Sequence, residues 1–127
     1  MTGPHDHASA EAFARDWIAA WNRRDIEAIV AHYAADGRFT SPRALERMGT
    51  ATVAGREMLK AYWQGARKLP KLHFTLDRVL WDAERRELVA LYTSDLGEQK
   101  IRAMEVMRIG ADGLIREGEA MYGAPVP

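Results

Sequence analysis

The chain has 127 residues, a formal net charge of zero, and 28% charged and 47% hydrophobic residues, a composition typical of one soluble globular domain. Zero net charge provides no overall field to attract nucleic acid or an anionic membrane, and no apolar segment approaches the roughly 20 residues of a membrane span. No cysteine is available for disulfides, thiolate metal sites or a thiol nucleophile. We therefore expect a cytoplasmic protein with no nucleic-acid or membrane partner.

The N-terminal segment, residues 1–8, is expected to be flexible. Its two histidines, His5 and His7, have nothing nearby to hold them in the geometry of metal ligands, and no motif elsewhere indicates a metal or another cofactor. Apolar residues then recur at helical spacing, which predicts a first helix from Ser9, as N-cap, to Arg24.

A second helix is expected to begin after Asp25 and to carry an apolar stripe that ends with Tyr33. Residues 38–41 predict a short strand, because the proline at position 42 forces Ser41 into an extended conformation and ends the segment. Residues 43–54 are expected to form a loop. A third helix is predicted from Gly55 to the Lys-Leu-Pro sequence at 68–70.

From residue 71 onward the hydrophobic period changes from helical to alternating. This change predicts four strands that short turns connect into an antiparallel meander, at residues 71–81, 87–95, 99–109 and 114–122. Helices first and strands later predict an α+β fold, with three N-terminal helices packed on one face of a curved sheet.

Glu105 interrupts an otherwise apolar set of alternating residues in the third of these strands. The set consists of Ile101, Ala103, Glu105, Met107 and Ile109. Successive strand side chains point to opposite faces, so this pattern places a carboxyl group inside an apolar cavity, where its pKa should rise. Two alternatives remain open: a bulge could turn Glu105 outward, or an arginine could hold it in a structural ion pair.

The last strand places Gly118, Ala120 and Tyr122 on one face. The small residues would leave room beside the sheet, and the tyrosine would bring a hydroxyl group to the end of that space. The alternative is that a helix packs closely on the glycine and the alanine. Trp17 and Trp63 lie on inner helical stripes, where most such residues belong to the core, although their N–H groups need partners.

Several short motifs in fixed order resemble the nuclear transport factor 2-like superfamily, in its SnoaL-like and ketosteroid isomerase branch. The motifs are W-x-x-A-W-N-x-x-D at 17–25, F-T-S-P at 39–42, G-x-x-x-x-x-x-Y-W at 55–63 and A-M-Y-G at 120–123. The resemblance implies a single SnoaL-like domain over residues 9–123, followed by a C-terminal tail at 124–127. It also implies a cone-shaped, curved antiparallel sheet wrapped around the helices, a cystatin-like α+β roll. The resemblance further implies a deep pocket at the open end of the cone and a homodimer that forms through the outer face of the sheet.

The resemblance also implies roles for three positions. In the isomerases the residue before the strand-ending proline is a carboxylate base, and that position is Ser41 here. Their oxyanion hole combines a residue of the first helix with a protonated acid of the sheet, which correspond to Trp17 and Glu105. A serine without an adjacent base is a poor proton acceptor at neutral pH, so we do not expect the usual steroid isomerase mechanism.

These observations favour a pocket that binds a small apolar organic molecule. Glu105 would act as acid or hydrogen-bond donor in an isomerase, lyase, hydratase or cyclase reaction. The expected ligand-binding residues are Trp17, Tyr33, Ser41, Trp63, Met107, Gly118, Ala120 and Tyr122. Two alternatives stay open: a binding protein without catalysis, and an interaction module. The latter would use an outer sheet face that carries Lys100, Arg102, Met104, Val106 and Arg108.

Overall fold

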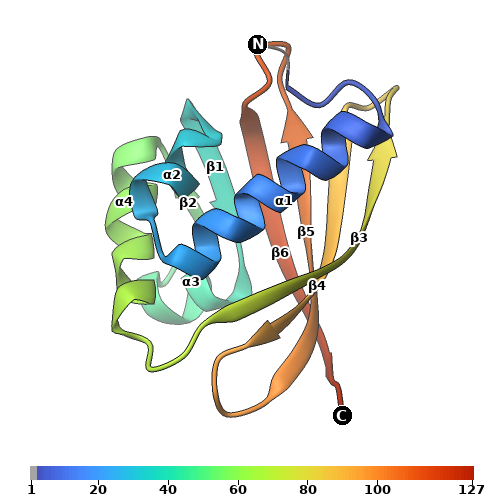
Figure 1. The fold of residues 1–127 in the computed structure, drawn as a ribbon. Coiled ribbons are helices and arrows are strands. Elements are labelled where there is room, and N and C mark those ends of the chain that lie inside the picture. Colours follow the sequence, from blue (N-terminus) through green and yellow to red (C-terminus); the bar gives the residue numbers. More distant parts are fainter. Residues whose placement is uncertain (1–2) are drawn as a thin grey trace.

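The computed structural model describes residues 3–127, so the first two residues of the expected flexible segment lie outside the described part. The elements are α1 (His7–Arg23), α2 (Ile26–Ala31), β1 (Tyr33–Thr40), α3 (Pro42–Met48), β2 (Thr52–Ala54), α4 (Arg56–Trp63), a 3-10 segment (Gln64–Lys68), β3 (His73–Asp82), β4 (Glu87–Asp95), β5 (Lys100–Ile109) and β6 (Ile115–Pro125). One six-stranded sheet has the order β2-β1-β6-β5-β4-β3, and α1, α2 and α4 lie over one of its faces (Figure 1). The predicted α+β architecture is confirmed.

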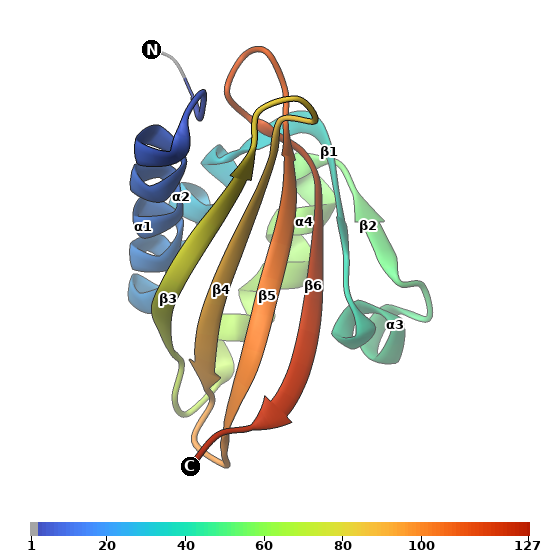
Figure 2. The same ribbon diagram turned by 90° about the vertical axis from the view of Figure 1, so that its right-hand side faces the viewer.

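The four long strands form the predicted antiparallel meander, and Figure 2 shows them side by side as a curved sheet with α4 behind it and α1 next to β3 on the left. One pairing differs from the expected all-antiparallel sheet. The strand β1 runs parallel to β6, with Phe39 opposite Gly118, and β2 then pairs with β1 in the antiparallel sense. This arrangement places the end of β1 and the start of α3 beside the last strand.

The first helix begins three residues before the predicted position. Its N-cap is Asp6, whose carboxylate accepts a hydrogen bond from the Ser9 N–H at 2.8 Å, and the Ser9 hydroxyl completes a capping box. Aspartate and serine both favour N-caps, and Ser9 occupies the third helical position instead. His7 therefore lies in α1, where Nε2 is 3.1 Å from the Val79 carbonyl oxygen.

Tyr33 lies on a strand and not on the second helix, which ends at Ala31. Its spacing from Val30 imitates the continuation of a helical stripe, but Tyr33 begins β1 and is fully buried. The Asp36-Gly37 pair that follows lies within β1, where the register between β1 and β6 shifts. Helical spacing over only a few apolar residues cannot distinguish a helix that continues to Tyr33 from a strand that begins there.

The segment expected to be a loop, residues 43–54, contains most of the helix α3 and the strand β2. Ser41 is extended, as predicted, and serves as the N-cap: its Oγ accepts a hydrogen bond from the Ala44 N–H at 3.1 Å. Pro42 stands at the start of the helix, and Gly49 ends it with a positive φ of 76°. A serine at the N-cap, a proline in the first turn and a glycine at the C-terminal end are standard signals of a short helix. The polar composition of the segment made it resemble a loop.

No helix within residues 3–127 has the length and apolar character needed to cross a membrane.

Candidate functional site

A cavity lies between the inner face of the sheet and the helices α1, α3 and α4. Its walls are mostly aromatic and aliphatic, and Trp21 and Trp63 meet edge to face in one of them, with ring centroids 5.5 Å apart. The centre of a water molecule can reach about 80 Å³ of this space. That is several times the roughly 10–15 Å³ that one water requires on the same measure. The cavity can therefore hold a small molecule or a few waters.

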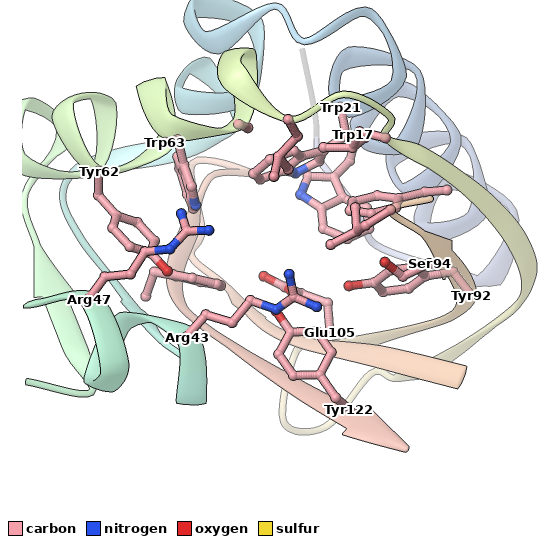
Figure 3. Close-up of a pocket in the computed structure, with 16 residues that line it drawn as sticks. Trp17, Trp21, Arg43, Arg47, Tyr62, Trp63, Tyr92, Ser94, Glu105 and Tyr122 are labelled. Atoms are coloured by element: carbon pink, nitrogen blue, oxygen red, sulfur yellow. The ribbon is translucent and has the colours of Figure 1, made fainter. Parts of the chain in front are cut away.

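Glu105 points into this cavity from the middle of β5 (Figure 3). The residue is 3% exposed. Its neighbours on the adjacent strands are Ala90 and Ala120, whose methyl side chains cannot form hydrogen bonds. The predicted inward orientation is confirmed. Neither open alternative applies, because the pairing of β5 is regular at Glu105 and no arginine within residues 3–127 forms an ion pair with it.

Burial raises the pKa of Glu105 from its ordinary 4.5 to about 8, because the ionised form loses its hydration. The opposing influence is a hydrogen bond from the Tyr33 hydroxyl to Oε2, which is long at 3.5 Å. A contact of that length is weak. Glu105 is therefore mainly a neutral carboxylic acid at pH 7, with a proton to donate.

Tyr33 fills the room that the sequence analysis expected beside the last strand. A Cβ atom at Gly118 would lie 2.5 Å from the Tyr33 hydroxyl oxygen, so glycine is needed for the phenol to approach the sheet. The same Cβ would lie 3.4 Å from Oε2 of Glu105. Gly118 and Tyr33 thus lie behind the carboxyl group and position it from the side away from the ligand space.

The structure brings four of the nine expected site residues to the cavity wall: Trp17, Trp63, Glu105 and Tyr122. The other five, Tyr33, Ser41, Met107, Gly118 and Ala120, do not line it. Met107 is fully buried in the core. The Ser41 hydroxyl is committed to capping α3 and does not face the cavity, so Ser41 shapes the site only through that helix.

Two arginines of α3 line the cavity and were missed by the sequence reasoning. Arg43 and Arg47 are four residues apart, which places both on one face of the helix. The Arg43 guanidinium carbon lies 4.7 Å from the centre of the Tyr122 ring, a cation–π distance. The capping residues Ser41, Pro42 and Gly49 could have revealed this helix. Once the helix is recognised, a spacing of four predicts that Arg43 and Arg47 lie on the same face.

Two further polar side chains of the wall come from β4, which was also not anticipated. Tyr92 and Ser94 both lie on the inner face of this strand and are 3% exposed. Burial raises the pKa of the Tyr92 phenol well above its usual 10, and burial raises that of Tyr122 to about 12. Both phenols are therefore neutral donors at physiological pH. No cluster of three or more potential metal ligands occurs among residues 3–127.

Comparison with known families and structures gives a consistent result. Residues 14–118 match the SnoaL-like domain family. A SnoaL-like protein of unknown function from Burkholderia thailandensis is 31% identical, with 95% of this chain and 99% of that chain covered and a TM-score of 0.85. No curated protein matches the chain.

Two more distant structures share the fold. A protein of unknown function with a cystatin-like fold, from Methylobium petroleophilum, has 23% identity and a TM-score of 0.77 over 100% of this chain and 82% of that one. The epoxide hydrolase/cyclase-like enzyme SalBIII, which has a role in pyran ring formation in the polyether salinomycin, has 14% identity. Its TM-score is 0.75, over 94% of this chain and 95% of that one.

Proposed function

The chain belongs to the SnoaL-like domain family, and on that basis we propose that it binds a small, mostly apolar organic molecule in the cavity and acts on it as an enzyme. Glu105 is the proposed catalytic acid. The observation that carries the proposal is a single carboxylic acid, 3% exposed and facing an aromatic cavity, with a pKa of about 8. A neutral acid near physiological pH can protonate a ligand oxygen or donate a hydrogen bond to it.

The proposed chemistry is acid-assisted opening, closure or rearrangement at an oxygen function of the ligand. Isomerase, lyase, hydratase and cyclase reactions all need such a donor, and the fold is shared with a cyclase-like enzyme. A standard ketosteroid isomerase mechanism is disfavoured, because the base position is Ser41 and its hydroxyl is held by the Ala44 N–H. Without a neighbouring base a hydroxyl group is a weak proton acceptor.

The experiment is turnover of a panel of small epoxides, enones and hydroxy ketones, with products detected by mass spectrometry. For any compound that is converted, Glu105→Gln should lower kcat by about 10²-fold or more, the usual contribution of a positioned acid. Binding and the circular dichroism spectrum should be retained. The matched control is Glu119→Gln, which removes an exposed carboxylate from the neighbouring strand. Full turnover by the Glu105→Gln variant contradicts the proposal.

A second candidate is binding without catalysis. The observation that favours it is that Glu105 is the only carboxyl group among the residues lining the cavity, so no carboxylate base accompanies the acid. In that case the panel yields compounds that bind in the cavity and are recovered unchanged, with equal affinity for the wild-type protein and the Glu105→Ala variant.

A further inference from the structure

The polar groups around the cavity are unbalanced in charge. Arg43 and Arg47 bring two guanidinium groups, and Figure 3 shows both pointing into the space that Glu105 also faces. Glu105, the one acid of the wall, is mainly neutral at pH 7. The wall therefore carries two positive charges and little compensating negative charge.

Arg43 lacks the partner that a half-buried arginine normally has. The guanidinium of Arg43 forms no salt bridge within residues 3–127, whereas several exposed arginines of the chain are paired, such as Arg15 with Glu11 and Arg108 with Glu117. The Tyr122 ring offers only a cation–π contact. Removing a charge from water without a hydrogen-bonded counter-ion is costly, so the site is suited to an anion that enters with the ligand.

A second, independent observation concerns the opposite wall. The indole Nε1 of Trp21 is buried without any hydrogen-bond partner, and the Trp21 side chain lines the cavity with only 9% of the residue exposed. An indole N–H can only donate. Trp21 is thus a further cavity-lining side chain whose donor has no acceptor, beside the guanidinium groups and the protonated carboxyl group.

We propose that the ligand is a small organic acid whose carboxylate binds to Arg43, with Arg47 assisting, while its apolar body lies against the aromatic wall. Arginine is suited to this role because its planar guanidinium can hold a carboxylate through two parallel hydrogen bonds. The other end of the ligand would then face Glu105. The inference rests on the proposed use of this cavity as the ligand site and adds the chemical class of the ligand.

The test compares acids with their uncharged analogues. Benzoate, phenylacetate, cinnamate and cyclohexanecarboxylate are titrated calorimetrically at pH 7, each beside its primary amide, with the wild-type protein and the variants Arg43→Gln and Arg47→Gln. The control is Arg38→Gln, which removes the same charge from an exposed position of β1 that does not line the cavity. Circular dichroism verifies that each variant is folded.

We expect at least one acid to bind about tenfold or more tightly than its amide, as a charge-assisted hydrogen bond allows. Arg43→Gln should remove that preference, Arg47→Gln should reduce it, and Arg38→Gln should leave it unchanged. If acids and amides bind equally, or if Arg43→Gln keeps the preference, the ligand class is wrong while the cavity remains a binding site. If neither series binds, both this inference and the proposed function are contradicted.

Discussion

At the scale of single residues, the site depends on small side chains as much as on polar ones. Ala90 and Ala120 flank Glu105 in the sheet and give its carboxyl group no polar neighbour. Gly118 admits the Tyr33 phenol, which reaches Oε2 only at 3.5 Å. The result is an acid that is neither ionised by a partner nor firmly hydrogen-bonded. Such an acid keeps its proton available for a ligand.

The raised pKa of Glu105 predicts a pH-dependent stability. Between its ordinary value of 4.5 and about 8 the folded chain binds one more proton than the unfolded chain. The free energy of unfolding should therefore fall as pH rises through this window, by up to about 1.4 kcal/mol per pH unit. The contribution is complete below pH 4.5 and is lost as pH passes 8.

The tyrosines that face Glu105 do not titrate in this window, because burial keeps the pKa values of Tyr33, Tyr92 and Tyr122 above their usual 10. Urea unfolding at a series of pH values measures the effect. Glu105→Gln should remove most of the slope between pH 5 and 8, and Glu119→Gln should retain it. Parallel curves for the wild-type protein and Glu105→Gln would show that Glu105 ionises normally.

At the scale of elements, α3 connects the fold to the site. It is a seven-residue helix that depends on its N-cap, since isolated helices of this length are unstable in water. Ser41→Ala removes the oxygen that accepts the Ala44 N–H, which should lower the free energy of unfolding by about 1 kcal/mol.

The same substitution should weaken ligand binding, because α3 carries both cavity arginines. Ser9→Ala is the control, since it removes a cap interaction at the start of α1, away from the cavity. It should lower stability to a comparable extent and leave affinity unchanged. Urea unfolding and calorimetric titration distinguish the two variants. Equal affinities for Ser41→Ala and the wild-type protein would mean that the arginines do not depend on the cap.

The elements that sequence reasoning predicted well are those with long periodic patterns. The four long strands, and the inward direction of Glu105, follow from alternation that persists over many residues, which a shift of register would disrupt throughout. The segment from Tyr33 to Ala54 was misread because α3 and β2 are short and β1 shifts its register against β6. There the position of Tyr33 is decided by pairing with β6, a long-range contact that local pattern does not contain. The cavity arginines were missed for a different reason: their helix α3 carries local capping signals at Ser41, Pro42 and Gly49, but the segment was expected to be a loop.

At the scale of the whole molecule, one face of the sheet is covered by helices and the other is not (Figure 2). The outer face carries a row of apolar side chains that are adjacent in register across three strands, Leu91, Met104 and Met121. Leu80 is 53% exposed and Met121 is 39% exposed. Outward residues of β5 alternate with the inward set that includes Glu105, so any partner on this face would contact the strand that holds the acid.

We propose that a second copy of the chain covers this outer face, and Met104→Glu tests the resulting homodimer. In a twofold interface each copy presents the same row of residues, so the substitution would place two new carboxylates against an apolar surface. Sedimentation velocity should show a dimer for the wild-type protein and a monomer for Met104→Glu. Met58→Glu alters an exposed methionine on α4 and should leave the dimer intact. A wild-type protein that stays monomeric at high concentration would contradict the homodimer. A dimer that is unaffected by Met104→Glu would place the interface on another surface.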